Sequence, residues 1–358
     1  MLMNYSQILE NTIVPINLNL DEKICRYEKL DQYINMYLPK KLYRFRTVSE
    51  RSLDQLYGDV LGFSDCSSMN DDFDARVCYD RNELDRWLKS FLTEENKTEL
   101  FKTILNMTEV PKEIKNVIPN AEGILKVMRN SSSEKFYFDL ENMIESFVTN
   151  FEEELKLLTL GVQESVKIAC FTEKIDSAMM WGQYANNATG FALEYEFLSN
   201  RIDFSSNLNE NYKMYGSIYP IDYSNRRIDA TDYVKFLYQS KLLKNALMMN
   251  GIVDDGGLIR FAVPCSDEFM ATKIALFKSK DWEPEKEWRL FLTSNNPALT
   301  FEKYPSVIYK PSAIFLGRKI SNINMKIITD IAKEKGIPVY RMGFDNMNRT
   351  YKLKPSKV

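Results

Sequence analysis

The sequence predicts an α+β fold with a mixed, mainly antiparallel sheet core, a helical insertion and flanking helices. Strand-like segments occur before residue 65 and again after residue 165. Between them, residues 82–160 have the apolar spacing of helices and few strand signals. A strand-helix-strand pattern follows over residues 313–342. We therefore expect one domain over residues 1–358, with residues 82–160 as the insertion.

The first elements are predicted from their periodicity. Residues 1–40 have helical spacing, and KLYRFR at 41–46 alternates like a short strand. Successive strand residues point to opposite faces, so Arg44 and Arg46 share one face. A second strand is expected at 60–64, followed by an acidic turn.

The later elements follow the same two periods. A capping-box pattern at residues 131–134 predicts one amphipathic helix that runs to residue 158. Residues 199–230 are predicted to be irregular, with one strand at 216–219. The other predicted elements are strands at 166–173 and 190–197, helices at 231–250 and 266–280, a strand in the second half of 282–293, a strand at 313–317, a helix at 323–335 and a strand at 337–342.

Histidine is absent from the sequence, which excludes several classes of chemistry. No imidazole is available as a general base, as the partner of a nucleophile, or as a metal ligand. Rossmann, P-loop and nucleophile-elbow motifs are also missing. Any chemistry therefore has to use carboxylates, arginines, hydroxyls and backbone groups.

Charge and cysteine usage restrict the partners and the compartment. The 47 Lys and Arg against 50 Asp and Glu give a net charge of −3, which argues against a generally basic nucleic-acid-coating protein but allows a local basic groove. The 5 cysteines form no CxxC pair and indicate reduced thiols. No signal peptide or apolar run of about 20 residues is found. We expect a cytoplasmic protein with no membrane partner.

The first candidate site is the segment WEPEKEWR, which contains Glu285, Glu287 and Arg289. In an extended chain these three side chains point to one face. One carboxylate could stabilise a developing cation while the other orients a nucleophile. The alternative is a solvated strand edge with weak Glu–Arg pairs.

The second candidate is the pair Arg44 and Arg46. Two guanidinium groups on one strand face suit a phosphate or carboxylate, because each donates bidentate hydrogen bonds. The alternative is that these arginines pair with Glu285, Glu287 or Asp74 of the same chain.

The third candidate is the run NDDFD at 70–74, which includes Asn70, Asp71 and Asp74. Clustered carboxylates could hold Mg²⁺ or Ca²⁺, but the EF-hand spacing does not occur. Asn and Asp also favour turns, because they bond their own backbone. We expect a shaped turn here and no metal site.

The fourth candidate is the segment MWGQYANNATG, which ends at Gly190. Trp181, Gln183 and Tyr184 could form a stacking and hydrogen-bonding platform for a base or ring. Trp181 and Tyr184 could equally be core anchors at helical spacing, and for Trp181 alone the core interpretation is favoured. The amide-rich segment that follows favours the platform.

Seven short segments together resemble a known family. They are YRFR at 43–46, FS at 63–64, NDDFD at 70–74, CFTE at 170–173, MWGQYA at 180–185, GF at 190–191 and WEPEKEWR at 282–289. In this order they resemble a large bacterial family known as domain of unknown function 2971, over roughly residues 40–342. That family usually has a histidine where this chain has Gln183, so an imidazole proton carrier is excluded here.

A second resemblance suggests an activity. An arginine strand, a Ser/Thr strand and a late Glu-x-Glu resemble the order found in arginine-serine-glutamate ADP-ribosyltransferases. This resemblance implies that NAD is a substrate whose phosphates bind Arg44 or Arg46. It also implies that Thr172 lies on the hydroxyl strand, Glu287 is catalytic and Glu285 orients the acceptor. Such cleavage of a glycosidic bond needs neither histidine nor a metal.

The leading hypothesis is thus an ADP-ribosyltransferase-like or NAD-cleaving enzyme, acting as a bacterial toxin or phage-defence effector. Its partners would be a small-molecule nucleotide and a protein or nucleic-acid acceptor. The rivals are a non-catalytic ligand- or partner-binding sensor module and a Mg²⁺-dependent phosphodiesterase built on Asp71, Asp72 and Asp74. Beside catalytic Glu287 and Glu285, the predicted binding residues are Tyr43, Arg44, Arg46, Ser64, Asn70, Asp71, Asp74, Thr172, Trp181, Gln183, Tyr184 and Arg289.

Overall fold

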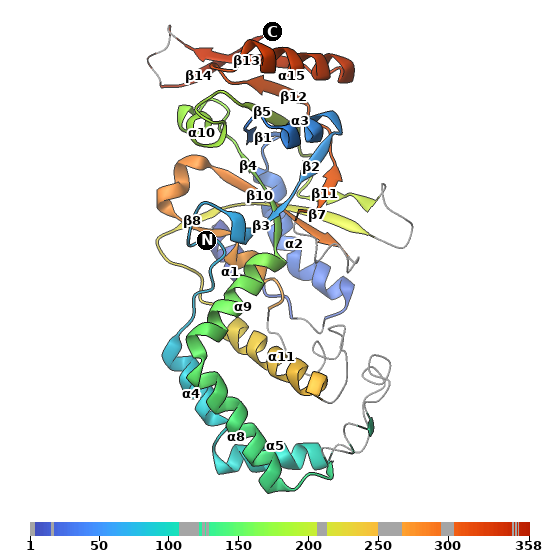
Figure 1. Ribbon diagram of the computed structural model, residues 1–358, viewed down its shortest axis with the longest axis vertical. Helices are drawn as coiled ribbons and strands as arrows, with labels where there is room; N and C mark the ends of the chain where they lie inside the picture. Colours follow the sequence, from blue (N-terminus) through green and yellow to red (C-terminus); the bar gives the residue numbers. More distant parts are fainter. Residues whose placement is uncertain are drawn as a thin grey trace.

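The computed structural model describes residues 4–15, 18–106, 129–205, 213–249, 267–294, 304–345 and 351–358, together with positions 122, 123, 126, 347 and 349. The fold is α+β, as predicted, and is built around a 10-stranded sheet (Figure 1). The strands of this sheet are β1 (Lys41–Arg46), β3 (Ser64–Asp65), β4 (Lys167–Thr172), β5 (Phe191–Glu196), β6 (Arg201–Asp203), β7 (Met214–Pro220), β10 (Glu287–Ser294), β12 (Ala313–Leu316), β13 (Val339–Phe344) and β14 (Leu353–Lys357).

The strand order is β14-β13-β12-β5-β1-β4-β10-β7-β6, with β3 paired to β4 beside this path. Neighbouring strands are antiparallel except β12 and β13, which run parallel and are connected by α15 (Asn322–Lys335). This connection confirms the predicted strand-helix-strand unit. Two small sheets pair β2 (Val60–Gly62) with β11 (Ser306–Ile308), and β8 (Asp222–Ser224) with β9 (Phe277–Ser279).

The described helices form two groups in Figure 1. One group gathers at the end of the molecule remote from β14 and consists of α4 (Arg81–Ser90), α5 (Glu94–Asn106), α8 (Ser133–Thr149), α9 (Phe151–Ser165) and α11 (Thr231–Met249). The other lies along the strands and consists of α1 (Tyr5–Asn11), α2 (Leu20–Tyr37), α3 (Glu50–Tyr57), α10 (Ala178–Tyr184), α13 (Met270–Ile274) and α15, with the 3₁₀ helices η1 (Cys66–Ser68) and η3 (Lys280–Glu285). None of the described helices has the length and apolar content needed to cross a bilayer.

The central strands are buried on both faces. In β4 and the first five residues of β10 nearly every side chain is buried, including Ile168, Trp288 and Leu290. A strand buried on both faces needs apolar side chains at nearly every position. Charged residues in these two strands are therefore exceptions that need partners, and two of them, Glu287 and Arg289 of β10, belong to the candidate site.

The register of three adjacent strands brings predicted residues into one row. Thr172 on β4 lies opposite Tyr43 on β1 and opposite Glu287 on β10. On one edge β4 has two partners in turn: Ile168 pairs with Ser64 of β3, and Thr172 pairs with Tyr43 of β1. In the described residues the stretch between these two pairings has no ladder partner on that edge. The sheet therefore opens beside Cys170 and Phe171, and a cavity lies there.

Two parts of the predicted helical insertion differ from the structure. The predicted single helix is two helices, α8 and α9, which meet at Asn150. The Asn150 side chain donates to the Ser146 carbonyl, a local bond that competes with the regular helix. The first of these helices is capped by Ser132, one residue later than the capping box predicts. Residues 107–121 of the insertion lie outside the described residues.

Two other predictions were wrong in part. Residues 199–230 contain β6, β7 and β8, although only the centre of β7 was predicted. Of the helix predicted at 266–280, only α13 is helical among the described residues, and β9 follows it. The strand β9 pairs with β8, so Lys278 comes from an extended segment. The strand β14 was not predicted.

Candidate functional site

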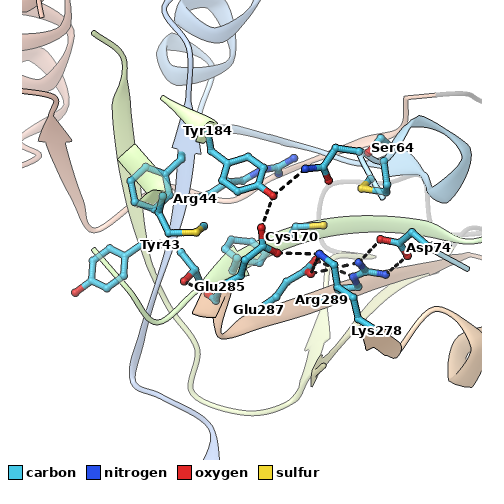
Figure 2. A pocket seen from close by; sticks show the side chains of 16 residues that line it. Tyr43, Arg44, Ser64, Asp74, Cys170, Tyr184, Lys278, Glu285, Glu287 and Arg289 are labelled. Atoms are coloured by element: carbon cyan, nitrogen blue, oxygen red, sulfur yellow. Dashed lines mark hydrogen bonds and ion pairs between the residues drawn. The ribbon is translucent and has the colours of Figure 1, made fainter. Parts of the chain in front are cut away.

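A cavity of 190 Å³ occupies the opening of the sheet (Figure 2). Its residues come from β1, β4, β10, α10, β9 and the segment around residues 64–74. Ten predicted site residues line it: Tyr43, Arg44, Ser64, Asn70, Asp74, Thr172, Tyr184, Glu285, Glu287 and Arg289. Residues spread over much of the sequence therefore meet at one place.

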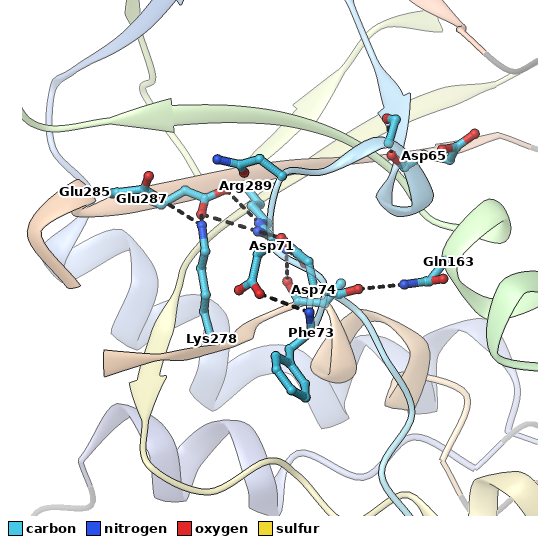
Figure 3. Close-up of polar contacts among 12 residues, drawn as sticks. Asp65, Asp71, Phe73, Asp74, Gln163, Lys278, Glu285, Glu287 and Arg289 are labelled. Atoms are coloured by element: carbon cyan, nitrogen blue, oxygen red, sulfur yellow. Dashed lines mark hydrogen bonds and ion pairs between the residues drawn. The ribbon is translucent and has the colours of Figure 1, made fainter. Parts of the chain in front are cut away.

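Three carboxylates and two cations form a continuous network on the cavity wall (Figures 2 and 3). The two terminal nitrogens of Arg289 donate to the two oxygens of Asp74, at 2.6 and 2.5 Å. Arg289 Nε donates to Glu287 Oε1 at 2.8 Å. Lys278 Nζ bridges Glu285 Oε2 at 2.8 Å and Glu287 Oε2 at 3.0 Å. The network therefore carries one excess negative charge when all five groups are ionised.

Because the network is buried, its ion pairs strongly affect the pKa values of Glu287 and Lys278. Glu285, Glu287 and Arg289 are 3%, 7% and 1% exposed, which contradicts the alternative of a solvated strand edge. Burial alone would raise the pKa of Glu287, but the charges and hydrogen bonds of Arg289 and Lys278 lower it to about 2. Burial and the charge of Arg289 lower the pKa of Lys278, but Glu287 and Glu285 outweigh them and raise it above its ordinary value. Glu287 is therefore a fixed anion at neutral pH.

Glu285 accepts from Lys278 on Oε2, and its other oxygen, Oε1, is held by a neutral hydrogen-bond relay. Tyr184 Oη donates to Glu285 Oε1 at 2.5 Å, and Asn70 Nδ2 donates to Tyr184 Oη at 3.1 Å. Burial and the hydrogen bond to Glu285 raise the pKa of Tyr184, so its phenol stays protonated. Oε1 of Glu285 thus accepts one bond from Tyr184 and Oε2 accepts one from Lys278, and each oxygen keeps a lone pair for another donor.

A second cavity, of 310 Å³, adjoins the first and shares Arg44, Phe45, Ser64 and Tyr184 with it. Its charged lining among the described residues is Arg44, Arg46 and Arg51. Burial and the charge of Arg44 lower the pKa of Arg46 to about 9. The predicted pairing of these arginines with Glu285, Glu287 or Asp74 is wrong, since those carboxylates pair with Lys278 and Arg289. The cavity is suited to an anion.

Some predicted binding residues have other roles. Trp181 is 1% exposed, packs edge-on against Phe45 and donates from its indole nitrogen to the Ile175 carbonyl, so it is a core residue. Gln183 is exposed on α10 and is outside the described lining of the cavity. Asp71 lines a third cavity, and Arg46 lines only the second. Thr172 lines the first cavity, but its hydroxyl donates to the Glu285 carbonyl at 2.5 Å.

The amide-rich segment after Tyr184 serves the backbone. Asn186, Asn187 and Ala188 have φ values of 47°, 54° and 64°, a left-handed turn that asparagine tolerates better than most residues. Its amide nitrogens bond carbonyls of α10, such as that of Trp181. The asparagines are thus explained by this turn, and the predicted hydrogen-bonding platform is not needed for them.

Sequence reasoning missed two site residues. Lys278 was assigned to a predicted helix, and only the pairing of β9 with β8 shows that it enters the network. Arg51 lies in α3 and had no motif to mark it. The one feature that could have marked Arg51 as a site residue is its closeness in sequence to Arg44 and Arg46.

The acidic turn at residues 70–74 has no metal-site geometry. Asp74 is bonded to Arg289, and Asp71 Oδ1 accepts from the Phe73 amide at 2.9 Å, as expected for a shaped turn. In the described part of the chain no group of three or more acidic or cysteine side chains is placed to hold a metal ion. The phosphodiesterase alternative gains no support from these residues.

The site thus belongs to the class of buried carboxylate–cation networks that face a cavity. Residues 180–290 match a family described as "Protein of unknown function (DUF2971)". The match includes Tyr184, Lys278 and Arg289, and it supports the resemblance to that family. Comparison with curated proteins and with solved structures gave no match.

The depressed pKa of Glu287 predicts acid lability. The group has an ordinary pKa of 4.5 in the unfolded chain and about 2 in the fold. Its contribution to stability is therefore complete above 4.5 and is lost as the pH falls towards 2, a loss of roughly 3 kcal/mol. Urea unfolding at a series of pH values measures this loss. The variant Glu287→Gln, which cannot titrate, should show a flatter decline in that window. Equal slopes for both proteins would contradict the prediction.

Proposed function

We propose that this protein cleaves the glycosidic bond of NAD, as an NAD-cleaving or ADP-ribosyltransferase-like enzyme. The observation that carries the proposal is the pairing of an arginine-lined cavity with a carboxylate-lined one, joined at Arg44, Ser64 and Tyr184. NAD has the matching features, a diphosphate next to a ribose with a positively charged nicotinamide. The resemblance to arginine-serine-glutamate ADP-ribosyltransferases agrees with this assignment.

The diphosphate would bind in the second cavity. Arg44, Arg46 and Arg51 supply three guanidinium groups, and no carboxylate is among the described residues that line this cavity. Charge-assisted bonds between arginine and phosphate are strong and directional. Bound phosphate would also relieve the mutual repulsion of Arg44 and Arg46.

The reacting ribose would then lie in the first cavity. In the reaction the C1′–N bond breaks, and its electron pair leaves with neutral nicotinamide. Positive charge develops on the ribose, where the excess negative charge of the network stabilises it. Glu287 supplies a permanent anion, and a free lone pair of Glu285 accepts the proton of the attacking water or acceptor.

Nicotinamide release from NAD tests the proposal. Replacing Glu285 with glutamine keeps the shape of the side chain but removes its basic oxygen, so kcat should fall by about 10²-fold or more. The matched control is Glu283→Gln, since Glu283 is exposed and pairs only with Lys286 among the described contacts. Arg46→Gln should mainly raise KM. An inactive wild type, or full activity of Glu285→Gln, would refute the proposal.

A second function is favoured by one feature of the network. Both oxygens of Glu287 accept bonds from cations, as they would in a purely structural ion cluster. In that case the protein would be a sensor that binds a nucleotide without cleaving it. Calorimetric binding of NAD by wild type, lost in Arg46→Gln, together with no nicotinamide release, would identify the sensor.

A further inference from the structure

A third cavity, of 250 Å³, touches the carboxylate–cation network through Lys278. Lys278 lines both cavities, and its ammonium group bonds Glu285 and Glu287. The cavity is formed by three segments, the turn at 71–76, the loop at 224–228 and residues 274–281. A ligand in it would lie one side chain away from the proposed reaction centre.

Three arginines give this cavity a basic character. The side chains of Arg76 and Arg226 are exposed and make no hydrogen bond or ion pair in the described part of the chain. The carboxylates of Asp71 and Asp281 also line the cavity, but both accept bonds within their own segments, from the Phe73 amide and the Ser279 hydroxyl. Arg76 and Arg226 are therefore available for an anionic ligand.

An exposed aromatic ring lies among these arginines. Phe73 is 63% exposed, and the guanidinium of Arg227 lies 5.7 Å from its ring centroid. In Figure 3 the ring points away from the carboxylate network. Phenylalanine faces and guanidinium planes are the surfaces on which unpaired nucleobases stack.

The turn that presents Phe73 is rigidly held. Its neighbour Asp74 is 2% exposed and is bonded by Arg289, and Gln163 donates to the Asp74 carbonyl at 2.8 Å. Ala75 follows with a φ of 50°, a conformation that persists only where the surroundings fix it. The exposure of Phe73 is thus imposed by the fold and presents a pre-organised surface.

We propose that this cavity binds single-stranded nucleic acid, with a base stacked on Phe73 and phosphates bonded by Arg76 and Arg226. The binding stands on these contacts alone. Its use as the acceptor strand rests on the proposed function: the bond from ribose C1′ to nicotinamide breaks, a bond from C1′ to a nucleotide N or O atom forms, and the displaced proton passes to Glu285. Duplex nucleic acid is a poor ligand, because its bases are not free to stack on the ring.

Fluorescence anisotropy with labelled single-stranded RNA and DNA of mixed sequence tests the proposal. The double variant Arg76→Gln/Arg226→Gln should weaken binding by about tenfold or more and flatten the salt dependence. The control Lys354→Gln/Lys357→Gln removes the same charge from β14, which lies at one end of the molecule and away from β8 (Figure 1), and should bind as wild type does.

The role of the Phe73 ring is tested by a second pair of variants, one at the site and one control. Phe73→Ala should weaken binding several-fold, whereas Phe138→Ala, an equally exposed phenylalanine in α8, should not. Comparing the RNA and DNA arms shows which nucleic acid is preferred. Absent binding by wild type, equal binding of a duplex, or no difference between each variant and its control would overturn the proposal.

Nicotinamide release measured on the same variants separates this proposal from the proposed function. Arg76→Gln/Arg226→Gln should hydrolyse free NAD at the rate of wild type. Strand binding that depends on Phe73 and Arg226, without any nicotinamide release, would support the nucleic-acid site and refute the enzyme. Nicotinamide release without strand binding would support the enzyme and refute the nucleic-acid site.

Discussion

Replacing Arg289 with methionine is expected to lower the free energy of unfolding by about 3–5 kcal/mol. The guanidinium is 1% exposed and bonds Asp74, Glu287 and the Ala275 carbonyl. Methionine fills a similar volume but leaves two carboxylates buried without this partner. Leaving a buried charge unpaired costs far more than an exposed ion pair contributes. Urea unfolding measured by circular dichroism gives the difference directly.

Two further variants test the cause of this loss. Arg81→Met removes an arginine of α4 that pairs with Asp85 and Glu152 at the surface, and should cost at most about 1 kcal/mol. The double variant Asp74→Leu/Arg289→Met removes one orphaned carboxylate and should recover part of the stability. If Arg289→Met were no worse than Arg81→Met, the network would not be the buried ion cluster described above.

Replacing Gly317 with alanine is expected to destabilise the fold by about 3 kcal/mol or more. A Cβ atom at this position would lie 2.2 Å from the Ala188 carbonyl oxygen and 2.8 Å from that of Gly190. Both contacts are with backbone, so no side-chain rotation can relieve them. The Gly317 amide also donates to the Gly190 carbonyl at 2.9 Å, which ties β12 to the left-handed turn. Thermal unfolding and soluble yield report the effect.

The matched control is Gly182→Ala in α10, where a Cβ atom would meet nothing within 4 Å. Alanine in a helix is more stable than glycine, so this variant should gain about 0.5–1 kcal/mol. A tolerated Gly317→Ala would show that β12 and the turn separate at little cost. The position of Tyr184, which precedes that turn, would then need another explanation.

Local pattern predicted the strands that build the site. The alternation of residues 41–46 and the apolar second half of residues 282–293 identified β1 and β10, and with them Arg44 and Glu287. Side-chain period and strand length depend on neighbours in sequence, so a single chain reveals them. The spatial convergence of these residues depends on the register of β1, β4 and β10, which the sequence alone does not give.

Partner choice within the site was not predictable in the same way. Glu285 could have paired with Arg44, Arg46, Arg289 or any lysine, and the fold selects Lys278 because a short parallel pairing of β8 and β9 delivers it. The amides of Asn186 and Asn187 were weighed as part of a ligand platform, and the left-handed turn gives these residues a backbone role that the sequence did not show. In both cases the role of the residue follows from backbone geometry that the sequence alone does not give.

The bond between Arg289 and Asp74 joins residues 215 positions apart and crosses the site. During synthesis, therefore, the ribosome releases β1, β4 and α10 well before the strand that completes the network. Until η3 and β10 emerge, Asp74 has no guanidinium to neutralise it, and Glu285 and Glu287 are not yet present. A chain that ends before β10 therefore lacks the assembled carboxylate–cation network. Contacts of such long sequence separation also form slowly, which further delays the completion of the network.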